Sequence, residues 1–276
     1  MLRAPRPRAG LTLPELLVLF VLAFFSVTLF LPAAEVAKQN AAKNECANNL
    51  RMLVLASANC HDKHGRFPPL VGDFPNEKAH GTLFYHILPF LDQDKVYTKG
   101  QGEKDRFSVW TNGVYSQVIK PFLCPADTSG GPDNRFEVWL AQTSYAANFQ
   151  VFGDPIENTM QGHARYGTVT DGASNTIFFA ERYQTCNGTP NAWGFAGEST
   201  TAPAFGYLTL AKFQDQPAQK DCDATRTQAI HVGGIHVGMG DGSTRFIAPN
   251  ISPRTWSLAV IPDDGLPLGG GTSTDW

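Results

Sequence analysis

A run of nineteen residues without a charged side chain, from Leu16 to Ala34, constrains this 276-residue chain more than any other feature. At ~1.5 Å per residue, a helix of that length approaches the ~30 Å thickness of the hydrocarbon core of a bilayer. A ten-residue leader with three arginines and no acid precedes the run and ends at Gly10. We therefore expect a leader over residues 1–10 and a transmembrane helix over residues 11–34.

Glu15 lies at the entrance of this run, where an ionisable side chain is costly and is a functional candidate by default. The sequence Gly10-Leu-Thr-Leu-Pro-Glu resembles the type IV prepilin leader, in which a dedicated peptidase cleaves after the glycine and methylates the new N-terminus. Counted from Leu11, Glu15 is the fifth residue and Pro32 the twenty-second, as in pilins and pseudopilins. The resemblance implies that Gly10, Leu11 and Glu15 act in processing, and that Glu15 and Pro32 act in assembly.

Two residues depart from the prepilin pattern, and a simple uncleaved signal anchor is the alternative interpretation. Leu11 replaces the usual phenylalanine, and Pro14 replaces the usual apolar residue. Proline is tolerated in the first turn of a helix, where its missing N–H would have no intrahelical partner anyway.

The charge distribution predicts orientation and excludes one class of partner. Arginines flanking a membrane helix stay on the cytoplasmic side, so we expect a single-pass protein of the cytoplasmic, or inner, membrane with an exported ectodomain. The net charge is −3, and the leader contributes +3, so the remainder carries −6. Such a balance argues against nucleic acid as a partner, because its binding requires basic patches.

The helical pattern continues beyond the apolar run, because residues 35–64 contain many alanines and neither glycine nor proline. Gly65 is a natural C-terminal cap, and Pro68-Pro69 forbid continuation. The sequence thus predicts a helix from about residue 12 to 64, interrupted or bent at Pro32, with residues 35–66 as its periplasmic part. Its predicted buried face consists of Leu50, Leu53, Val54, Ala58 and His61, widened by Met52 and Leu55.

The remaining segment, residues 67–276, reads as an α+β ectodomain. The chain has 26 glycines and 19 prolines, which favour turns and short elements over a helical bundle. We expect a pilin-like α+β fold: a long N-terminal helix, transmembrane in its first half, packed on a mainly antiparallel β ectodomain with long loops. The expected elements are short helices at 80–92 and 251–260, strands at 115–122, 143–152 and 175–181, a hairpin turn at Asp241-Gly242, and loops at 184–205 and 214–226.

The five cysteines contain no CxxC pair, which argues against a zinc site or a thioredoxin-like motif. An exported domain permits disulfides, and two disulfides among five cysteines can form in fifteen ways. Cys46 and Cys60 on one helix would lie ~21 Å apart, too far to bond. The sequence favours Cys186–Cys222, because both flank loop-rich segments.

A second resemblance rests on His231 and Asp241-Gly242, with nine residues between the histidine and the aspartate. The chain is similar to a large bacterial family of uncharacterised exported proteins that pair a prepilin-type N-terminus with a His-x9-Asp-Gly motif. Val232 departs from the proline that normally follows the histidine. The resemblance implies a pseudopilin-like architecture and no known reaction. Its further matches are Asn48–Arg51, His61–Pro69, Leu88–Gln93, Phe122–Asp127 and Thr170–Thr176.

A catalytic role for His231 and Asp241 competes with a structural one. The pair could act with Ser243 as a nucleophile, but Asp-Gly-Ser also suits a hairpin turn for backbone reasons alone. The chain has no G-x-S-x-G elbow, H-E-x-x-H or P-loop. We therefore expect a protein that is not an enzyme.

Metal binding is the weaker alternative at several positions, and we expect no cofactor. Calcium could be held by oxygens of Asp171, Asp241, Asp263 and Asp264, although no EF-hand spacing is present and turn formation explains these residues better. His61 and His64, with Cys60 beside them, have a spacing that could share one metal ion, although polar residues are favoured at a helix C-terminus anyway.

The leading hypothesis is a membrane-anchored, pseudopilin-like structural subunit. Its partners would be the prepilin peptidase, the inner membrane, and further copies of itself or other pseudopilins. The alternative is a tethered module that binds a carbohydrate or a metal-dependent ligand through the 184–226 loops, and an exported hydrolase is the third candidate. The aromatic residues that could line a sugar-binding surface are Trp110, Trp139, Trp193, Tyr183 and Tyr207.

Overall fold

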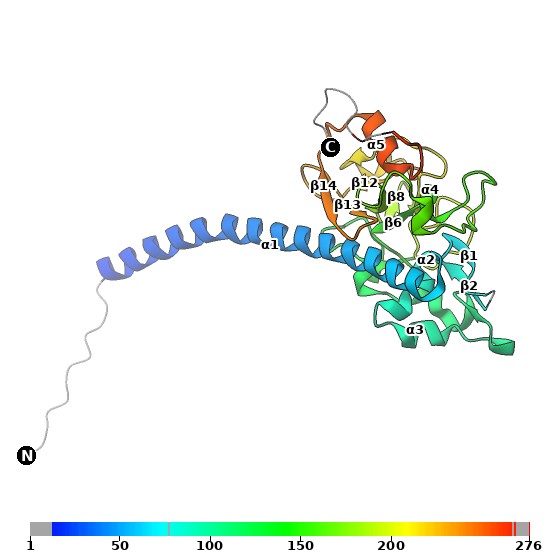
Figure 1. Cartoon of the computed structure of the whole chain (residues 1–276). Coiled ribbons are helices and arrows are strands. Elements are labelled where there is room, and N and C mark those ends of the chain that lie inside the picture. Colours follow the sequence, from blue (N-terminus) through cyan, green and yellow to red (C-terminus); the bar gives the residue numbers. More distant parts are fainter. Residues whose placement is uncertain (1–12, 77, 267, 269–275) are drawn as a thin grey trace, which may run out of the picture. The chain divides into compact units, whose positions relative to one another are not determined.

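A single helix, α1, runs from Leu13 to His64 (Figure 1). The structure is a computed structural model that describes residues 13–76, 78–266, 268 and 276, without the side chains of residues 23, 25–34 and 104. Gly10 and Leu11 therefore lie outside the described residues, and Pro32 is described only by its helical backbone. No helix in these ranges combines the length and apolar content needed to cross a membrane.

The C-terminal end of α1 has the expected cap. Gly65 adopts φ 73°, and its N–H donates to the carbonyl of His61 at 2.7 Å, which satisfies a carbonyl of the last turn. The predicted helix over residues 12–64 thus agrees with the observed bounds.

The chain divides into two compact units, residues 1–42 and 43–276, and α1 contributes to both. Within the second unit, one face of α1 is buried at intervals of three and four residues, as the sequence predicts. Leu55 is a correction, because its side chain is 44 % exposed, and Met52, Ala58 and His61 are only half-buried. The buried face consists of Cys46, Asn49, Leu50, Leu53, Val54, Ala56, Ser57 and Cys60.

A five-stranded sheet lies at the centre of the second unit, in the order β10-β6-β7-β13-β14. All its neighbouring strands are antiparallel except β10 and β6, which are parallel. The central strands β7 and β13 are buried along their whole length. The bounds are β6 Tyr145–Asn148, β7 Ile177–Glu181, β10 Ala204–Phe205, β13 Ile235–Met239 and β14 Thr244–Ile247.

Helices cover the sheet on both faces. A Cβ placed on Gly238 of β13 would lie 2.8 Å from Val54 of α1, so glycine is required for this close approach of helix and strand. The second core contains Val237 and Met239 of β13 together with Trp256 of α5, which runs from Pro253 to Val260. The fold is a mixed α+β one built around a mainly antiparallel sheet.

Short strands and short helices make up the remaining regular structure of the second unit. The short strands are β1 Val71–Asp73, β2 Ala79–Thr82, β3 Phe107–Ser108, β4 Arg135–Phe136, β5 Leu140–Ala141, β8 Thr185–Cys186, β9 Thr189–Pro190, β11 Gln214–Asp215 and β12 Gln228–Ala229. The α-helices are α2 Leu83–His86, α3 Asp94–Lys99 and α4 Phe149–Phe152. The 3-10 helices are η1 Leu88–Phe90, η2 Glu103–Asp105, η3 Thr111–Ser116, η4 Lys120–Phe122, η5 Pro132–Asn134, η6 Tyr166–Thr168 and η7 Gln219–Asp221.

One predicted element, the strand at 115–122, is wrong in type, and the helix at 80–92 and the strand at 143–152 are confirmed only in part. The segment 80–92 begins as β2, and the Thr82 hydroxyl then accepts from the N–H of Tyr85 and starts α2. The segment 115–122 forms 3-10 turns, because Pro121 fixes φ at the start of η4. The segment 143–152 changes from strand to helix at Asn148, whose side chain caps α4 through the N–H of Gln150.

The predicted strand near residues 175–181, the hairpin at Asp241-Gly242 and the helix near residues 251–260 agree with β7, the β13–β14 hairpin and α5. Arg182, directly after β7, explains how the long loops are ordered. Its buried guanidinium donates to the carbonyls of Thr200, Ala202, Ala204 and Ala224. One side chain thus joins both predicted loop segments to the sheet.

Candidate functional site

His231 lies between β12 and β13, in a tight loop that ends at Gly234. A Cβ on Gly234 would lie 2.2 Å from the carbonyl oxygen of Ile247, so only glycine fits there. The adjacent Val232 is 70 % exposed, whereas His231 is 5 % exposed. The loop therefore directs the histidine inward, although valine occupies the position after it.

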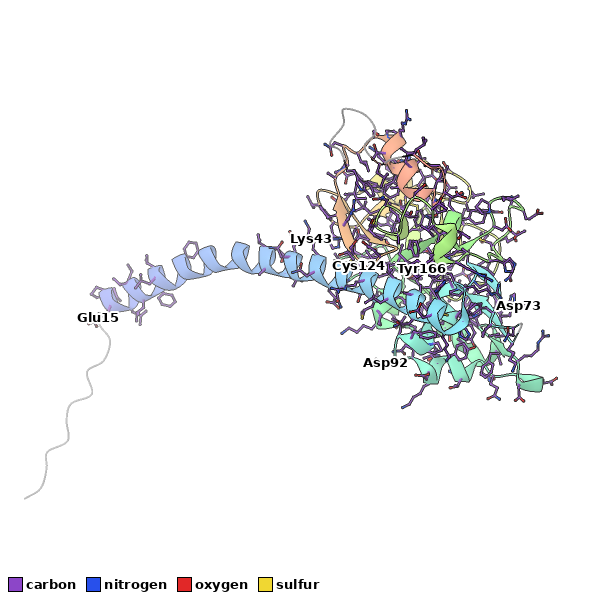
Figure 2. All side chains as sticks on the ribbon, viewed as in Figure 1. Glu15, Lys43, Asp73, Asp92, Cys124 and Tyr166 are labelled. Atoms are coloured by element: carbon purple, nitrogen blue, oxygen red, sulfur yellow. A yellow bond between two sulfur atoms is a disulfide. The ribbon has the colours of Figure 1, made fainter. Side chains whose placement is uncertain are left out.

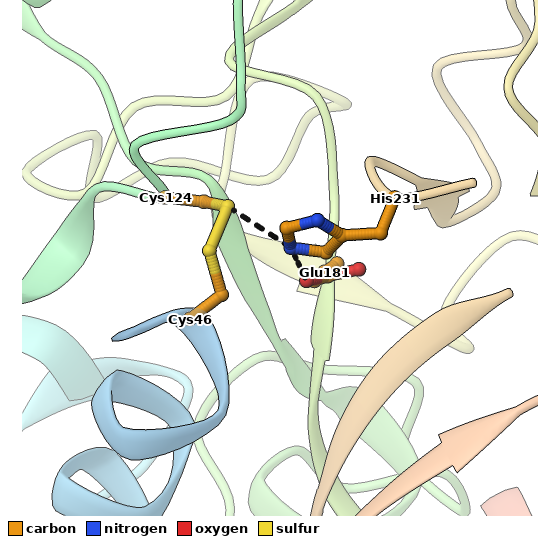
Figure 3. A group of neighbouring side chains, drawn as sticks. All are labelled: Cys46, Cys124, Glu181 and His231. Carbon is orange, nitrogen blue, oxygen red and sulfur yellow. Dashed lines mark hydrogen bonds and ion pairs between the residues drawn. A yellow bond between two sulfur atoms is a disulfide. The ribbon is translucent and has the colours of Figure 1, made fainter. Parts of the chain in front are cut away.

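The inward-facing imidazole meets Glu181, the last residue of β7 (Figure 3). The distance from His231 Nε2 to Glu181 Oε1 is 3.2 Å, and Glu181 Oε2 accepts the backbone N–H of His236 at 3.0 Å. Glu181 is completely buried, and burial raises the pKa of its carboxyl, while the contact with His231 opposes that rise. Breaking a buried charge pair by removing one partner typically costs ~3–5 kcal/mol.

A disulfide completes this cluster. Cys46 of α1 is bonded to Cys124, and Cys124 Sγ lies 3.4 Å from His231 Nε2 (Figure 3). Figure 2 shows Cys124 beside the ribbon of α1. We call Cys46, Cys124, Glu181 and His231 the buried cluster.

The buried cluster has the composition of a metal site but not its chemistry. Its four ligand atoms lie within 4.8 Å of one another. Metals bind cysteine as the thiolate, and the disulfide removes both thiolates. The imidazole and one carboxylate remain, which is too few for a closed structural site. In this oxidised form the buried cluster is a structural connection between α1, β7 and the loop before β13.

His236 extends the buried cluster toward the surface. Its ring packs on His231 with centroids 5.1 Å apart and on Phe246 at 4.7 Å. Burial, followed by the charges of His231 and Lys43, lowers the pKa of His236 to about 4. Lys43 lies over the Phe246 ring and donates to the carbonyl of Val232 at 3.1 Å.

The other half of the His-x9-Asp-Gly motif lies at the opposite end of β13. Asp241 and Gly242 form the exposed tip of the β13–β14 hairpin, where Gly242 has φ 86°. Asp241 Oδ1 accepts the backbone N–H and the hydroxyl of Ser243 at 2.9 and 2.6 Å. The nine residues between His231 and Asp241 therefore comprise β13 and the turns at its two ends. The structure does not bring His231 and Asp241 together as a catalytic pair.

The predicted calcium ligands are likewise occupied or separated. The two carboxylate oxygens of Asp171 each accept a backbone N–H, from Asp264 and Gly265, at 2.9 Å. Asp171, Asp241 and Asp263 form no common ligand cluster in the described part of the chain. Asp171 thus joins the turn before β7 to the segment after α5.

The histidines at the end of α1 pack against aromatic rings. His61 lies 4.7 Å from Phe67 and 4.8 Å from Tyr166, and His64 lies 5.1 Å from Phe74, all centroid to centroid. Cys60 is completely buried, and burial raises the pKa of its thiol to about 12. The structure does not bring Cys60, His61 and His64 together as a cluster of ligand atoms.

The predicted sugar-binding aromatics do not form one surface. Trp193 is buried and donates its indole N–H to the carbonyl of Gln117 at 2.9 Å. Trp110 and Trp139 both pack against Tyr115, whereas Tyr207 packs on Phe149.

Sequence reasoning missed Glu181, His236 and the partner of Cys46. The signal for Glu181 was present, because an acid and an arginine directly follow four apolar residues of a buried strand. The disulfide Cys186–Cys222, which the sequence favoured, is present in the structure and connects β8 with the end of η7.

Residues 35–254 match the sequence profile of a protein family described as "Protein of unknown function (DUF1559)". The chain belongs to this family. The match covers the part of α1 beyond the apolar run, the buried cluster and the hairpin, and ends within α5. No curated protein and no solved structure matches the chain.

Proposed function

We propose that this DUF1559 chain is a membrane-anchored, pseudopilin-like structural subunit that a prepilin peptidase processes after Gly10. Its N-terminus would lie in the cytoplasm, and residues beyond about 35 would form the exported ectodomain. Its fold would be pilin-like, with the first half of α1 in the cytoplasmic membrane. We assign it a role in assembly and no catalytic reaction.

The supporting observation is the exposure of the apolar residues in the first turns of α1. Seven consecutive apolar side chains, Leu16 to Leu22, are each 45–69 % exposed. Because seven residues make about two turns, every side of the helix is apolar and exposed. In water this surface would be unfavourable at roughly 25 cal/mol per Å², whereas lipid or neighbouring helices would cover it favourably.

The two disulfides support an exported location for the second unit. Cys46–Cys124 and Cys186–Cys222 involve four of the five cysteines. Disulfides form and persist in oxidising compartments such as the periplasm and are rare in the cytosol.

Glu15 would direct assembly. It lies in the first turn of α1, and cleavage after Gly10 would leave a free amine on Leu11 four residues before it. In the low dielectric of the membrane, the carboxylate would attract the amine of a neighbouring subunit more strongly than in water. The same attraction explains why a charge would be retained in an otherwise apolar helix.

The decisive experiment compares Glu15→Val with Glu35→Val, an exposed acid outside the apolar run. Each full-length variant is expressed in a host with the peptidase, and intact mass and membrane cross-linking are measured. Wild type and both variants should begin at methylated Leu11, and Glu15→Val alone should lose cross-linked multimers. A chain that begins at Met1, or normal multimers of Glu15→Val, would contradict the proposal.

A further inference from the structure

A polar cavity of about 310 Å³ lies beside the buried cluster, within the second unit. Four segments of the chain form its walls: the loop after Cys124, the residues after β7, the stretch from the end of β11 into η7, and the residue after β12. Part of this wall belongs to the 184–226 loops, in which the sequence predicted a ligand site. The residues that carry its chemistry are Asp127, Ser129, Tyr183, Gln216, Gln219 and Ile230.

Covalent bonds and the buried cluster fix these walls in place. Asp127 follows Cys124, which is bonded to Cys46, by three residues. Gln219 precedes Cys222, which is bonded to Cys186, by three residues. Ile230 directly precedes His231, whose ring is held by Glu181. Rigid walls of this kind reduce the entropy that a ligand must lose on binding.

Asp127 places a carboxyl group beside the cavity. Its Oδ1 accepts from the N–H and hydroxyl of Ser129, and its Oδ2 accepts from the Ser144 hydroxyl at 2.8 Å and the Gln184 N–H at 3.1 Å. These four neutral donors fill the roughly four acceptor positions of an ionised carboxylate. Burial raises the pKa of this carboxyl, and the four hydrogen bonds oppose the rise because they favour the ionised form. The donors are neutral, so they leave the charge of the ionised carboxylate uncompensated.

The other polar groups of the wall present acceptors. The amide nitrogen of Gln216 donates to the Ile230 carbonyl at 3.2 Å, and that of Gln219 donates to the Thr185 carbonyl at 2.9 Å. The Tyr183 hydroxyl donates to the Pro217 carbonyl at 3.4 Å. Each amide nitrogen donates to a protein carbonyl, and the amide oxygens of the two glutamines remain available as acceptors for a ligand.

Two further observations favour a ligand site at the cavity. Burial, followed by the charges of Asp127 and Asp215, raises the pKa of the Tyr183 hydroxyl to about 12, which is consistent with a negative field around the ring. Gln216 has φ 41°, a left-handed conformation that costs free energy for a residue with a side chain and that concentrates at binding sites.

We propose that this cavity binds a small aliphatic primary ammonium ion. An ammonium group has three N–H donors and a positive charge, which complement the Gln216 and Gln219 oxygens and the charge of Asp127. The Tyr183 ring can attract the cation through its face, and Ile230 offers an apolar contact to the alkyl chain. This inference concerns the second unit and does not depend on assembly through Glu15.

The same contacts disfavour a calcium ion as the ligand. A calcium ion needs six to eight oxygen ligands, and the oxygens of Asp127 already accept four hydrogen bonds.

The test uses the full-length protein in a neutral detergent at pH 7. Binding of butylammonium chloride is measured by calorimetry and by ligand-observed NMR against 1-butanol, a neutral molecule of similar shape. We expect saturable one-to-one binding of butylammonium, and butanol binding about tenfold weaker or less, as expected for loss of charged hydrogen bonds. Gln216→Met and Gln219→Met should each weaken butylammonium binding severalfold, whereas Gln101→Met, outside the cavity, should leave it unchanged.

Three results would overturn the proposal: equal binding of butanol and butylammonium, unchanged binding in both cavity variants, or stoichiometric displacement of butylammonium by calcium chloride. The glutamine variants keep Asp127 and its hydrogen bonds, so a loss of binding in them can be separated from unfolding by circular dichroism. Loss of multimers in Glu15→Val would leave these expectations unchanged.

Discussion

The two units of the chain differ in how they are stabilised. Residues 13–42 form one stretch of helix whose described apolar side chains are exposed, whereas residues 43–276 contain two buried cores, two disulfides and the buried cluster. The exposed apolar surface of the first unit is therefore unfavourable in water unless other apolar groups cover it. The second unit is stabilised by its own internal contacts. Substitutions should separate the units accordingly. Under the proposed function, changes before residue 43 should affect membrane binding and assembly, whereas changes after it should affect the free energy of unfolding.

The largest expected effect is removal of the Cys46–Cys124 disulfide by Cys46→Ala with Cys124→Ala. The bond spans 78 residues, and the chain-entropy relation gives a loss of about 4.5 kcal/mol in the free energy of unfolding. Cys186→Ala with Cys222→Ala spans 36 residues and should cost somewhat less. Urea denaturation measures both. A larger loss from the shorter bond would contradict the entropic account.

The next effect concerns the buried cluster. His231→Ala leaves the Glu181 carboxylate buried without its partner and should lower the free energy of unfolding by ~3–5 kcal/mol. Asp241→Ala, at the other end of β13, removes only the turn contacts with Ser243 and should cost ~1 kcal/mol. Equal losses in the two variants would refute the assignment of different roles to the two ends of the motif.

Acid should destabilise the second unit through His86, which is buried and whose Nε2 lies 3.1 Å from the Gly72 carbonyl. Burial lowers the pKa of His86 to about 4, so between pH 6.5 and 4 the unfolded chain binds a proton that the folded chain does not. The contribution is fully present above pH 6.5 and is lost as the pH falls through 4, by about 3 kcal/mol.

Urea titrations at several pH values would show this loss, and His86→Leu should reduce the slope in that window. His236, with its pKa also lowered to about 4, should contribute in the same direction. A slope that is the same in wild type and in His86→Leu would exclude His86 as its source.

The smallest effect is expected in the first unit. Leu19→Ala removes an apolar side chain that is 53 % exposed and should change the free energy of unfolding of the second unit by less than about 0.5 kcal/mol. Val54→Ala is the matched change on the buried face of α1 and should cost about 1–3 kcal/mol. A clear loss from Leu19→Ala would show that the two units are energetically coupled.

The helices and turns that the sequence predicted correctly are those that a few neighbouring residues determine. The end of α1 follows from Gly65 and the prolines after it, and the β13–β14 hairpin follows from Asp241-Gly242. Where it failed, a single side chain changed the local structure, as with Thr82 before α2 and Asn148 before α4. The periodicity of apolar residues does not reveal such caps, because each cap depends on a hydrogen bond between a side chain and a backbone N–H.

The candidate site was less accessible to sequence reasoning, because its members come from four separate segments. The nine-residue spacing drew attention to Asp241 as the partner of His231, whereas the true partner, Glu181, lies fifty residues earlier in the chain. Long-range pairing of this kind depends on strand order, here β7 beside β13, which a single sequence does not display.

The Cys46–Cys124 bond also has a mechanical consequence. It closes residues 46–124 into a covalent loop, so tension applied between the N-terminus and the C-terminus passes from Cys46 directly to Cys124. The load bypasses residues 47–123, including the buried half of α1, and reaches the central sheet through the segment after Cys124. Under the proposed function, a subunit pulled by its N-terminal helix would therefore keep the buried half of α1 docked while the segment after Cys124 bears the load.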